Sequence, residues 1–180
     1  MNHTIRVSFC GVLAGLSVAL LFLTALLPTG SIGFPAVAGL LLVIPVIEIG
    51  VRWAFPIYLT AALLALFFVP NKQAAALYVF FFGYYPLLKA LVERPRNKAL
   101  QWVLKLVVFN VAAVSGYLIV VVLNLLPVGS FQLFGISLPW VFWLVGNGVF
   151  VLYDIAMTGV ILFYIKRLHP TFRKWLRQKK

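Results

Sequence analysis

Residues 89–105, KALVERPRNKALQWVLK, form the only dense cluster of charge between two long apolar halves of this 180-residue chain. A basic segment between apolar segments is typical of a cytoplasmic loop that joins two membrane spans. The stretch therefore predicts a multi-span membrane protein and gives a reference for its topology. Its charged residues are Lys89, Glu93, Arg94, Arg96, Lys98 and Lys105.

The composition of the whole chain agrees with membrane embedding. Hydrophobic residues make up 64% of the sequence, charged residues make up 10%, and the mean hydropathy is +1.08. A soluble protein of this size could not cover its surface with so few polar side chains. The net charge of +12 then indicates positive-inside topology and attraction to anionic lipid, and it does not indicate nucleic-acid binding.

The apolar segments predict an all-α integral membrane protein, a bundle of six transmembrane helices in a single membrane domain over residues 1–180. Turn-forming or charged residues separate segments that approach the length of about 20 residues needed to cross a bilayer. The first segment can alternatively be interpreted as a cleaved signal peptide, although its apolar run exceeds the roughly 7–15 residues usual there. The predicted spans cover residues 7–27, 35–50, 53–70, 74–91, 100–126 and 138–165, followed by a basic tail at 166–180.

The basic residues orient these six spans. If successive spans alternate in direction, every lysine and arginine except Lys72 falls on one side of the membrane. The positive-inside rule makes that side cytoplasmic. We therefore predict that the N-terminus, the C-terminus, the loop 89–105 and the tail 166–180 are cytoplasmic. The predicted location is the cell membrane, as a multi-pass protein of a bacterial plasma membrane.

The sequence contains no recognisable catalytic or metal-binding motif. Cys10 is the only cysteine, and His3 and His169 lie at opposite ends of the chain, so no cluster has the spacing of a metal site. A Walker A loop, a dinucleotide fingerprint, a zinc-protease helix and a nucleophile elbow are all missing. We expect no cofactor and no enzymatic activity, because an intramembrane enzyme would need a catalytic pair and Asp154 alone does not supply one.

Polar and aromatic residues form a stripe on each of the last three predicted spans. Spacings of three, four or seven residues place the members of a stripe on one helix face. The stripes are Tyr78, Phe82, Tyr85 and Lys89; Asn110, Tyr117 and Asn124; and Trp140, Trp143, Asn147, Asp154 and Thr158.

If the three stripes face one another, they predict a pocket for a small planar or amphipathic molecule in the outer half of the bundle. The alternative is that the amides and hydroxyls bond helix to helix, while the tryptophans belong to an interfacial belt. The residues predicted to bind substrate are Tyr78, Tyr117, Asn124, Trp140, Trp143 and Asn147.

Charged residues within the apolar segments predict two ion pairs. Asp154 is the only acidic residue deep in a span, and we expect it to pair with Lys89 and Lys105 in preference to acting as a proton relay. Glu48 and Arg52 are four residues apart, so we expect them to pair on one helix face near the water boundary.

Small residues recur every fourth position on the first predicted span, at Gly11, Gly15 and Ala19. Small side chains at this spacing let another helix approach closely. The approaching helix could belong to this bundle or to a separate membrane subunit, and the sequence leaves both alternatives open.

Six short helices in 180 residues, the small-residue face at Gly11, Gly15 and Ala19, and the stripes on the last three spans resemble the substrate-binding subunits (S components) of energy-coupling-factor (ECF) transporters. The resemblance implies that the first span docks on a transmembrane coupling protein and that ATPase subunits complete the transporter. It also implies uptake of a vitamin-like small molecule from outside. The alternative function is a non-transport membrane scaffold or assembly protein that recruits cytoplasmic partners or anionic lipid through its basic loop and tail.

Overall fold

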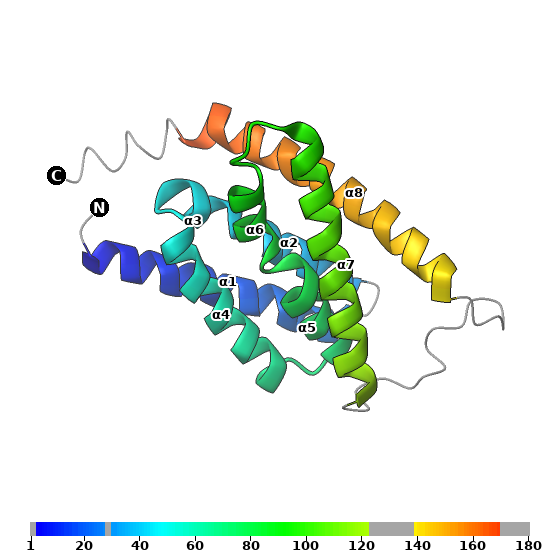
Figure 1. Cartoon of the computed structure of the whole chain (residues 1–180). Coiled ribbons are helices and arrows are strands. Elements are labelled where there is room, and N and C mark those ends of the chain that lie inside the picture. The colour runs from blue at the N-terminus through cyan, green and yellow to red at the C-terminus, as the bar shows by residue number, and fades with distance from the viewer. Residues whose placement is uncertain (1–2, 28–29, 123–138, 170–180) are drawn as a thin grey trace.

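A computed structural model describes residues 3–27, 30–122 and 139–169. Within these ranges every regular element is a helix, as an all-α membrane protein requires (Figure 1). In chain order the elements are α1 (His3–Leu26), α2 (Gly33–Leu41), α3 (Val43–Glu48), α4 (Val51–Phe68), α5 (Lys72–Leu77), the π-helical turn η2 (Tyr78–Phe82), α6 (Tyr85–Val92), α7 (Lys98–Val122), α8 (Pro139–Phe163) and the π-helical turn η4 (Tyr164–Leu168).

Among the described residues, five helical segments are long and apolar enough to cross a membrane. The predicted second span differs from them, because Gly33–Glu48 is shorter and is interrupted at Leu42, between α2 and α3. Pro45 lacks the N–H that would bond to the carbonyl four residues earlier, which explains the interruption. At 1.5 Å per residue, the segment is about 24 Å long, whereas the hydrocarbon core is roughly 30 Å thick.

Contacts at the two ends of the bundle show that the first four helical segments alternate in direction. At one end, the rings of His3 and Trp53 lie 5.5 Å apart, so the start of α1 meets the start of α4. At the other end, the Asn71 side chain donates a hydrogen bond to Ser31 Oγ at 3.0 Å. The turn after α1 and the turn after α4 therefore lie together, away from the start of the chain.

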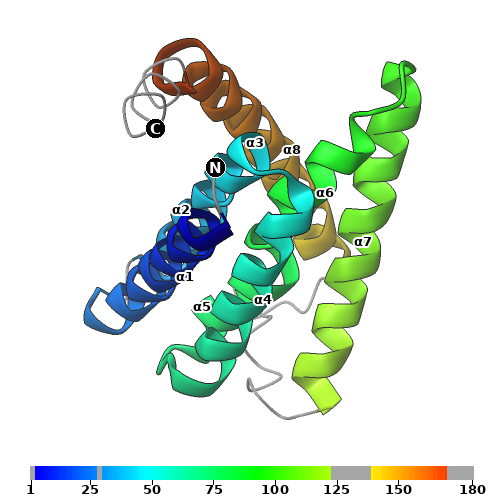
Figure 2. The same cartoon turned by 90° about the vertical axis from the view of Figure 1, so that its left-hand side faces the viewer.

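The last two long helices are antiparallel to each other. Lys105 of α7 contacts Asp154 of α8, and further along α7 Asn110 contacts Asn147, which precedes Asp154. Figure 2 shows α7 on the opposite side of the bundle from α1 and α2, while α8 crosses the bundle diagonally in Figure 1.

The first core lies among α1, α2, α4 and the segment from α5 to η2, and alanine allows these helices to pack closely. At the closest approach, a Cβ atom added to Gly39 of α2 would lie 2.3 Å from the backbone oxygen of Phe82. Glycine is therefore required at position 39. The buried alanines of this core are Ala14, Ala38, Ala54, Ala61, Ala62, Ala65 and Ala75.

The π-helical turn η2 divides the stripe that was predicted from Tyr78 to Lys89. Gly83 N donates to Tyr78 O at 2.7 Å, a bond that spans five residues and places an extra residue in the turn. The faces before and after the turn are consequently out of α-helical register. Tyr78 lies in the first core, whereas Tyr85 lies in the second.

The second core joins α8 to the rest of the molecule. It consists of buried Val43 from α3, Tyr85 from α6, and Phe150 and Met157 from α8. The ring of Phe150 stacks on Phe109 of α7 at 4.4 Å and meets Tyr85 edge-on at 5.1 Å. Aromatic packing therefore fills the space between α6, α7 and α8.

The predicted helical pair of Glu48 and Arg52 is wrong, because the two residues belong to different helices. Glu48 ends α3 and Arg52 lies in α4, with Gly50 between them at a φ of +89°. Residues with a side chain rarely adopt a positive φ, so glycine here allows a sharp change of direction. Glu48 instead contacts the end of the last helix.

Candidate functional site

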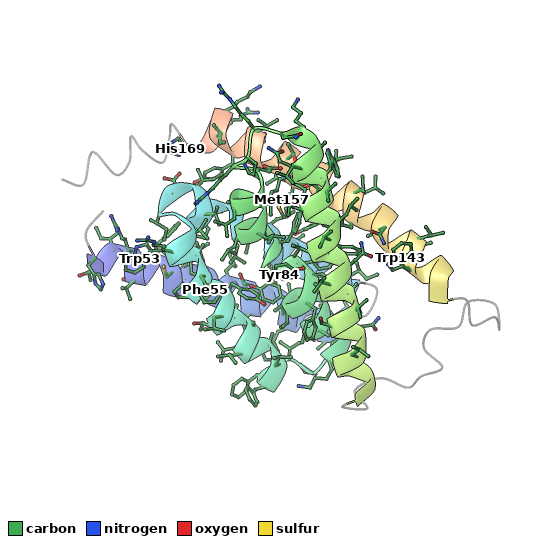
Figure 3. The ribbon with its side chains drawn as sticks, viewed as in Figure 1. Trp53, Phe55, Tyr84, Trp143, Met157 and His169 are labelled. Atoms are coloured by element: carbon green, nitrogen blue, oxygen red, sulfur yellow. The ribbon has the colours of Figure 1, made fainter. Side chains whose placement is uncertain are left out.

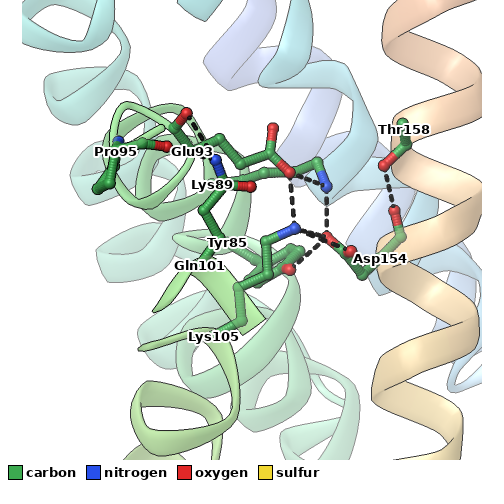
Figure 4. Close-up of polar contacts among 8 residues, drawn as sticks. All are labelled: Tyr85, Lys89, Glu93, Pro95, Gln101, Lys105, Asp154 and Thr158. Carbon is green, nitrogen blue, oxygen red and sulfur yellow. Dashed lines mark hydrogen bonds and ion pairs between the residues drawn. The ribbon is translucent and has the colours of Figure 1, made fainter. Parts of the chain in front are cut away.

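Four charged side chains form a closed network where α6 ends (Figure 4). Lys89 contacts Glu93 Oε1 at 2.7 Å and also contacts Asp154 Oδ1. Lys105 contacts Glu93 Oε1 at 2.6 Å and Asp154 Oδ2 at 3.0 Å. Each ammonium therefore lies between the same two carboxylates, and the four formal charges sum to zero.

Burial makes this network structurally important. Lys89, Lys105 and Asp154 are 1%, 4% and 3% exposed. The Tyr85 hydroxyl donates a further hydrogen bond to Asp154 Oδ1 at 2.6 Å. Unpaired ions in such surroundings would be strongly unfavourable, so each charge depends on the others. The structure thus brings together the three residues that the sequence predicted as a buried ion pair.

Glu93 completes the network as a fourth charged group, which the prediction of an ion pair from sequence did not include. Its spacing of four residues from Lys89 is typical of helical ion pairs and was the available signal. Its side chain is 37% exposed, in contrast to the other three charged groups. Burial raises the pKa of the Glu93 carboxyl, but hydrogen bonds from Lys105 and Lys89 outweigh this effect and hold the pKa below its usual value.

The loop after α6 is held in place by side chains of α7. Gln101 Nε2 donates to Pro95 O at 2.7 Å and to Glu93 O at 3.2 Å. Asn97 Oδ1 accepts a hydrogen bond from Ala99 N at 3.0 Å and so caps the start of α7. The backbone at Glu93 is therefore fixed, and the position of its carboxylate depends mainly on its own side-chain torsions.

A second polar contact joins α7 to α8. Asn110 and Asn147 exchange side-chain hydrogen bonds of 3.0 and 3.2 Å. The Trp143 indole N–H donates to Asn110 Oδ1, and Trp143 is 53% exposed. Figure 3 shows Trp143 near the start of α8, on the opposite side of the molecule from Trp53. These bonds are of the helix-to-helix kind that was the alternative to a pocket.

Of the other predicted pocket residues, the structure describes only the side chain of Tyr78, which lies apart from Trp143 and Asn147. Tyr78 is fully buried in the first core, with its ring 6.2 Å from that of Tyr58. Asn124 lies outside the described residues, and the side chains of Tyr117 and Trp140 lie outside the described side chains.

The Tyr153 hydroxyl oxygen is buried and makes no hydrogen bond within the described structure. The Tyr153 ring packs edge-on against Phe82 at 4.9 Å. A buried hydroxyl without a partner loses its hydration and gains no bond in return. The Tyr153 side chain therefore contributes to packing through its ring.

Glu48 connects α3 to the end of the last helix through two polar contacts. The Tyr164 hydroxyl donates to Glu48 Oε1 at 2.8 Å, and His169 Nδ1 lies 2.8 Å from the same oxygen. Tyr164 and His169 are five residues apart across η4, whose wider π-helical turn brings residues at that spacing closer to one face. Sequence spacing does not reveal this contact, because Glu48 is more than a hundred residues away.

The small-residue face of α1 points away from the rest of the described chain. Gly11, Gly15 and Ala19 are exposed, and a Cβ atom added to either glycine meets nothing within 4 Å. The opposite face of α1, which includes Leu13 and Leu21, packs into the first core. Within the described residues, no other helix of the bundle covers this face.

The described residues contain no group of three or more His, Cys, Asp or Glu side chains that could hold a metal ion. The apolar helices and the buried polar networks between them define the class as an all-helical, multi-pass, membrane-embedded protein. Searches of protein-family models, curated proteins and solved structures found no match for this chain.

Proposed function

We propose that this protein is a membrane subunit that docks on a second transmembrane protein through α1, as the S component of an ECF-type transporter. The supporting observation is the exposed face at Gly11, Gly15 and Ala19. Val12 and Leu16 beside it are 68% and 47% exposed. Small residues flanked by large apolar ones allow the backbone of another helix to approach closely within the membrane.

The proposed arrangement has six spans, with Gly33–Glu48 as a short second span. A short apolar segment can be accommodated by local thinning of the bilayer. In this arrangement the cytoplasmic side holds the charge network, the contacts of Glu48 with the last helix, and every lysine and arginine except Lys72.

The proposed substrate is a small, vitamin-like molecule that enters from the outer side. Its site would lie between α7 and α8, with Trp143 and Asn147 at its inner boundary and Tyr117, Asn124 and Trp140 further out. ATPase subunits and a transmembrane coupling protein would be the partners. Tyr78 is not included in this site, because its side chain is buried in the first core.

The docking face is tested by co-purification with a coupling protein. Gly11→Leu combined with Gly15→Leu should abolish association, since two large side chains would hold the partner helix away. Gly148→Leu combined with Gly159→Leu is the matched control, because added Cβ atoms at these α8 glycines also meet nothing within 4 Å. If the α1 variant still co-purifies with the coupling protein, docking through this face is refuted.

The substrate site is tested by ligand-induced thermal stabilisation. Combined Ala substitutions at Asn124, Trp143 and Asn147 should remove the stabilisation by a bound substrate, because binding stabilises the folded state by mass action. Val145 and Val149 are exposed residues of α8, the helix that carries Trp143 and Asn147. Ala substitutions at these two valines should retain the stabilisation by substrate. Stabilisation that survives the first set of substitutions would place the ligand elsewhere.

A membrane scaffold is the second candidate, and the filled interior between α6, α7 and α8 favours it. Phe109, Phe150 and Tyr85 are in ring contact there, as are Phe82 and Tyr153. A scaffold would bind no small molecule. Its association with cytoplasmic partners should weaken when the basic loop is neutralised at Arg94, Arg96 and Lys98.

A further inference from the structure

We propose that Lys89 and Lys105 form a phosphate-binding site in which the Glu93 carboxylate holds the place of the phosphate. The ligand is a phosphate monoester or inorganic phosphate, supplied by an anionic lipid headgroup or by solution. The inference rests on the proposed orientation, in which residues 89–105 lie at the cytoplasmic membrane boundary. It does not depend on the identity of a transported substrate.

The two ammonium groups converge on a single carboxylate oxygen. Glu93 Oε1 lies 2.7 Å from Lys89 Nζ and 2.6 Å from Lys105 Nζ. Asp154 holds the same two ammoniums from within the bundle and thereby fixes their positions. Two fixed cations that meet at one point suit an anion with several acceptor oxygens, because charge-assisted hydrogen bonds are the strongest available to it.

Glu93 is the member of the network that can exchange with an external anion. Its side chain is 37% exposed, whereas that of Asp154 is 4% exposed. Glu93 follows the last residue of α6, and Gln101 fixes the backbone at this point. Rotation of the Glu93 side chain would therefore open the two lysines to water without unfolding the loop.

The surroundings of Glu93 favour an anion of higher charge. Arg94, Arg96 and Lys98 follow it directly and are exposed. A phosphate monoester carries a charge of about −1.5 to −2 near neutral pH and offers three acceptor oxygens, whereas a carboxylate carries one charge. Anionic lipids also concentrate at the cytoplasmic membrane surface and attract basic segments.

Competition between Glu93 and phosphate for the two lysines determines how much phosphate affinity should rise when the Glu93 charge is removed. The apparent affinity for phosphate is reduced by the fraction of molecules in which the site is open. A minor open state populated to about 10% or less corresponds to a loss of roughly tenfold or more. Removal of the Glu93 charge should therefore tighten phosphate binding by about tenfold or more.

The test uses the full-length protein in phosphatidylcholine nanodiscs, with and without phosphatidic acid, and titrates inorganic phosphate as the soluble probe. Glu93→Gln should bind phosphate about tenfold more tightly than wild type, and Lys105→Met added to it should remove the binding. Glu48→Gln is the matched control, because it makes the same chemical change at a carboxylate that contacts Tyr164 and His169. This control should bind as wild type does.

The outcomes separate the sources of the ligand. Binding of inorganic phosphate in nanodiscs of phosphatidylcholine alone identifies free phosphate as the ligand. Binding that is seen only when the nanodiscs contain phosphatidic acid identifies the lipid headgroup as the ligand. Equal affinity in wild type, Glu93→Gln and Glu48→Gln would overturn the proposal, as would binding that survives the Lys105→Met change.

A second variant covers the case in which Glu93→Gln does not fold. Glu93→Asp keeps the charge but shortens the side chain by one methylene, which weakens its hold on both lysines. It should bind phosphate more tightly than wild type, and the absence of any gain would overturn the proposal. Co-purification that persists in the α1 variant would refute the docking proposal and would leave these results unchanged, so the two failures are distinguishable.

Discussion

Asp154 accepts hydrogen bonds from Tyr85, Lys89 and Lys105, which lie on the two helices that face α8. These bonds connect α6, α7 and α8 at one point in surroundings that are otherwise apolar. In such surroundings an ion pair contributes little net stability over an apolar pair, but loss of one partner is strongly destabilising. Substitutions of single residues in this network should therefore change the free energy of unfolding strongly.

Asp154→Asn should lower the free energy of unfolding by about 3–5 kcal/mol, because it leaves two buried ammoniums with one partially exposed carboxylate. Lys105→Met in the same chain should restore neutrality and leave Lys89 paired with Glu93. The double variant should accordingly lose less stability than the sum of the two single variants. Denaturant unfolding in detergent measures all three, and strict additivity would contradict a shared network.

Tyr85→Phe and Tyr153→Phe remove the same atom from two neighbouring tyrosines whose hydroxyl groups are buried. The Tyr85 hydroxyl bonds to a carboxylate, so its loss should cost about 1.5–3 kcal/mol of stability. The Tyr153 hydroxyl has no partner in the described structure, so its loss should be neutral or stabilising. Thermal unfolding of the two variants provides the comparison, and equal effects would show that the Asp154 bond contributes nothing specific.

The segment from Lys72 to Val92 shows how one element serves two cores. Its first part packs against α1, α2 and α4, and its last part packs against α8. The π-helical turn η2 lies between these parts and changes the face that is presented. At the same turn, α2 approaches so closely that its Gly39 contacts the backbone of η2.

Gly39→Ala should destabilise the protein by about 1–3 kcal/mol, because the added methyl group would meet the backbone of Phe82 and the helices would have to move apart. Gly148→Ala on α8 is the control for helix propensity, since its added methyl group meets no other atom within 4 Å. The control should be neutral or more stable by up to about 1 kcal/mol. A stabilising Gly39→Ala, measured by thermal unfolding, would contradict the close approach.

For the whole molecule, the number of membrane spans depends on whether Gly33–Glu48 crosses the bilayer. If this segment crosses and the N-terminus is cytoplasmic, Lys72 lies outside the cell and Arg96 lies in the cytoplasm. If it does not cross, the positions of both residues are reversed for the same placement of the N-terminus. Cys10 is the only cysteine, so its replacement by alanine gives a background for single-cysteine labelling.

In the Cys10→Ala background, a membrane-impermeant maleimide should label Lys72→Cys in intact cells. Arg96→Cys should react only after the cells are permeabilised. These results are expected from six spans with the basic loop in the cytoplasm. The reverse pattern would contradict this arrangement, because it requires either that Gly33–Glu48 does not cross the membrane or that the whole bundle is inverted.

The class of the protein and the approximate positions of the long helices could be predicted from sequence, because hydropathy and periodicity are local properties. The ion-pair partners of Asp154 could be predicted from sequence for a related reason. A lone buried acid requires a counter-charge, and few lysines lie at a matching depth. The spacing of four residues between Lys89 and Glu93 is typical of a helical ion pair, so this contact was also predictable from sequence.

The other features of the fold depend on contacts between helices that are distant in sequence. The hydrophobic pattern alone determined an all-helical membrane protein, since an apolar helix satisfies its own backbone hydrogen bonds wherever its neighbours lie. Only the tertiary structure showed that η2 separates Tyr78 from Tyr85, that Glu48 bonds to the last helix, and that the small-residue face of α1 points outward. Each of these features depends on which side chains meet across helices that are distant in sequence, and helical periodicity carries no information about such neighbours.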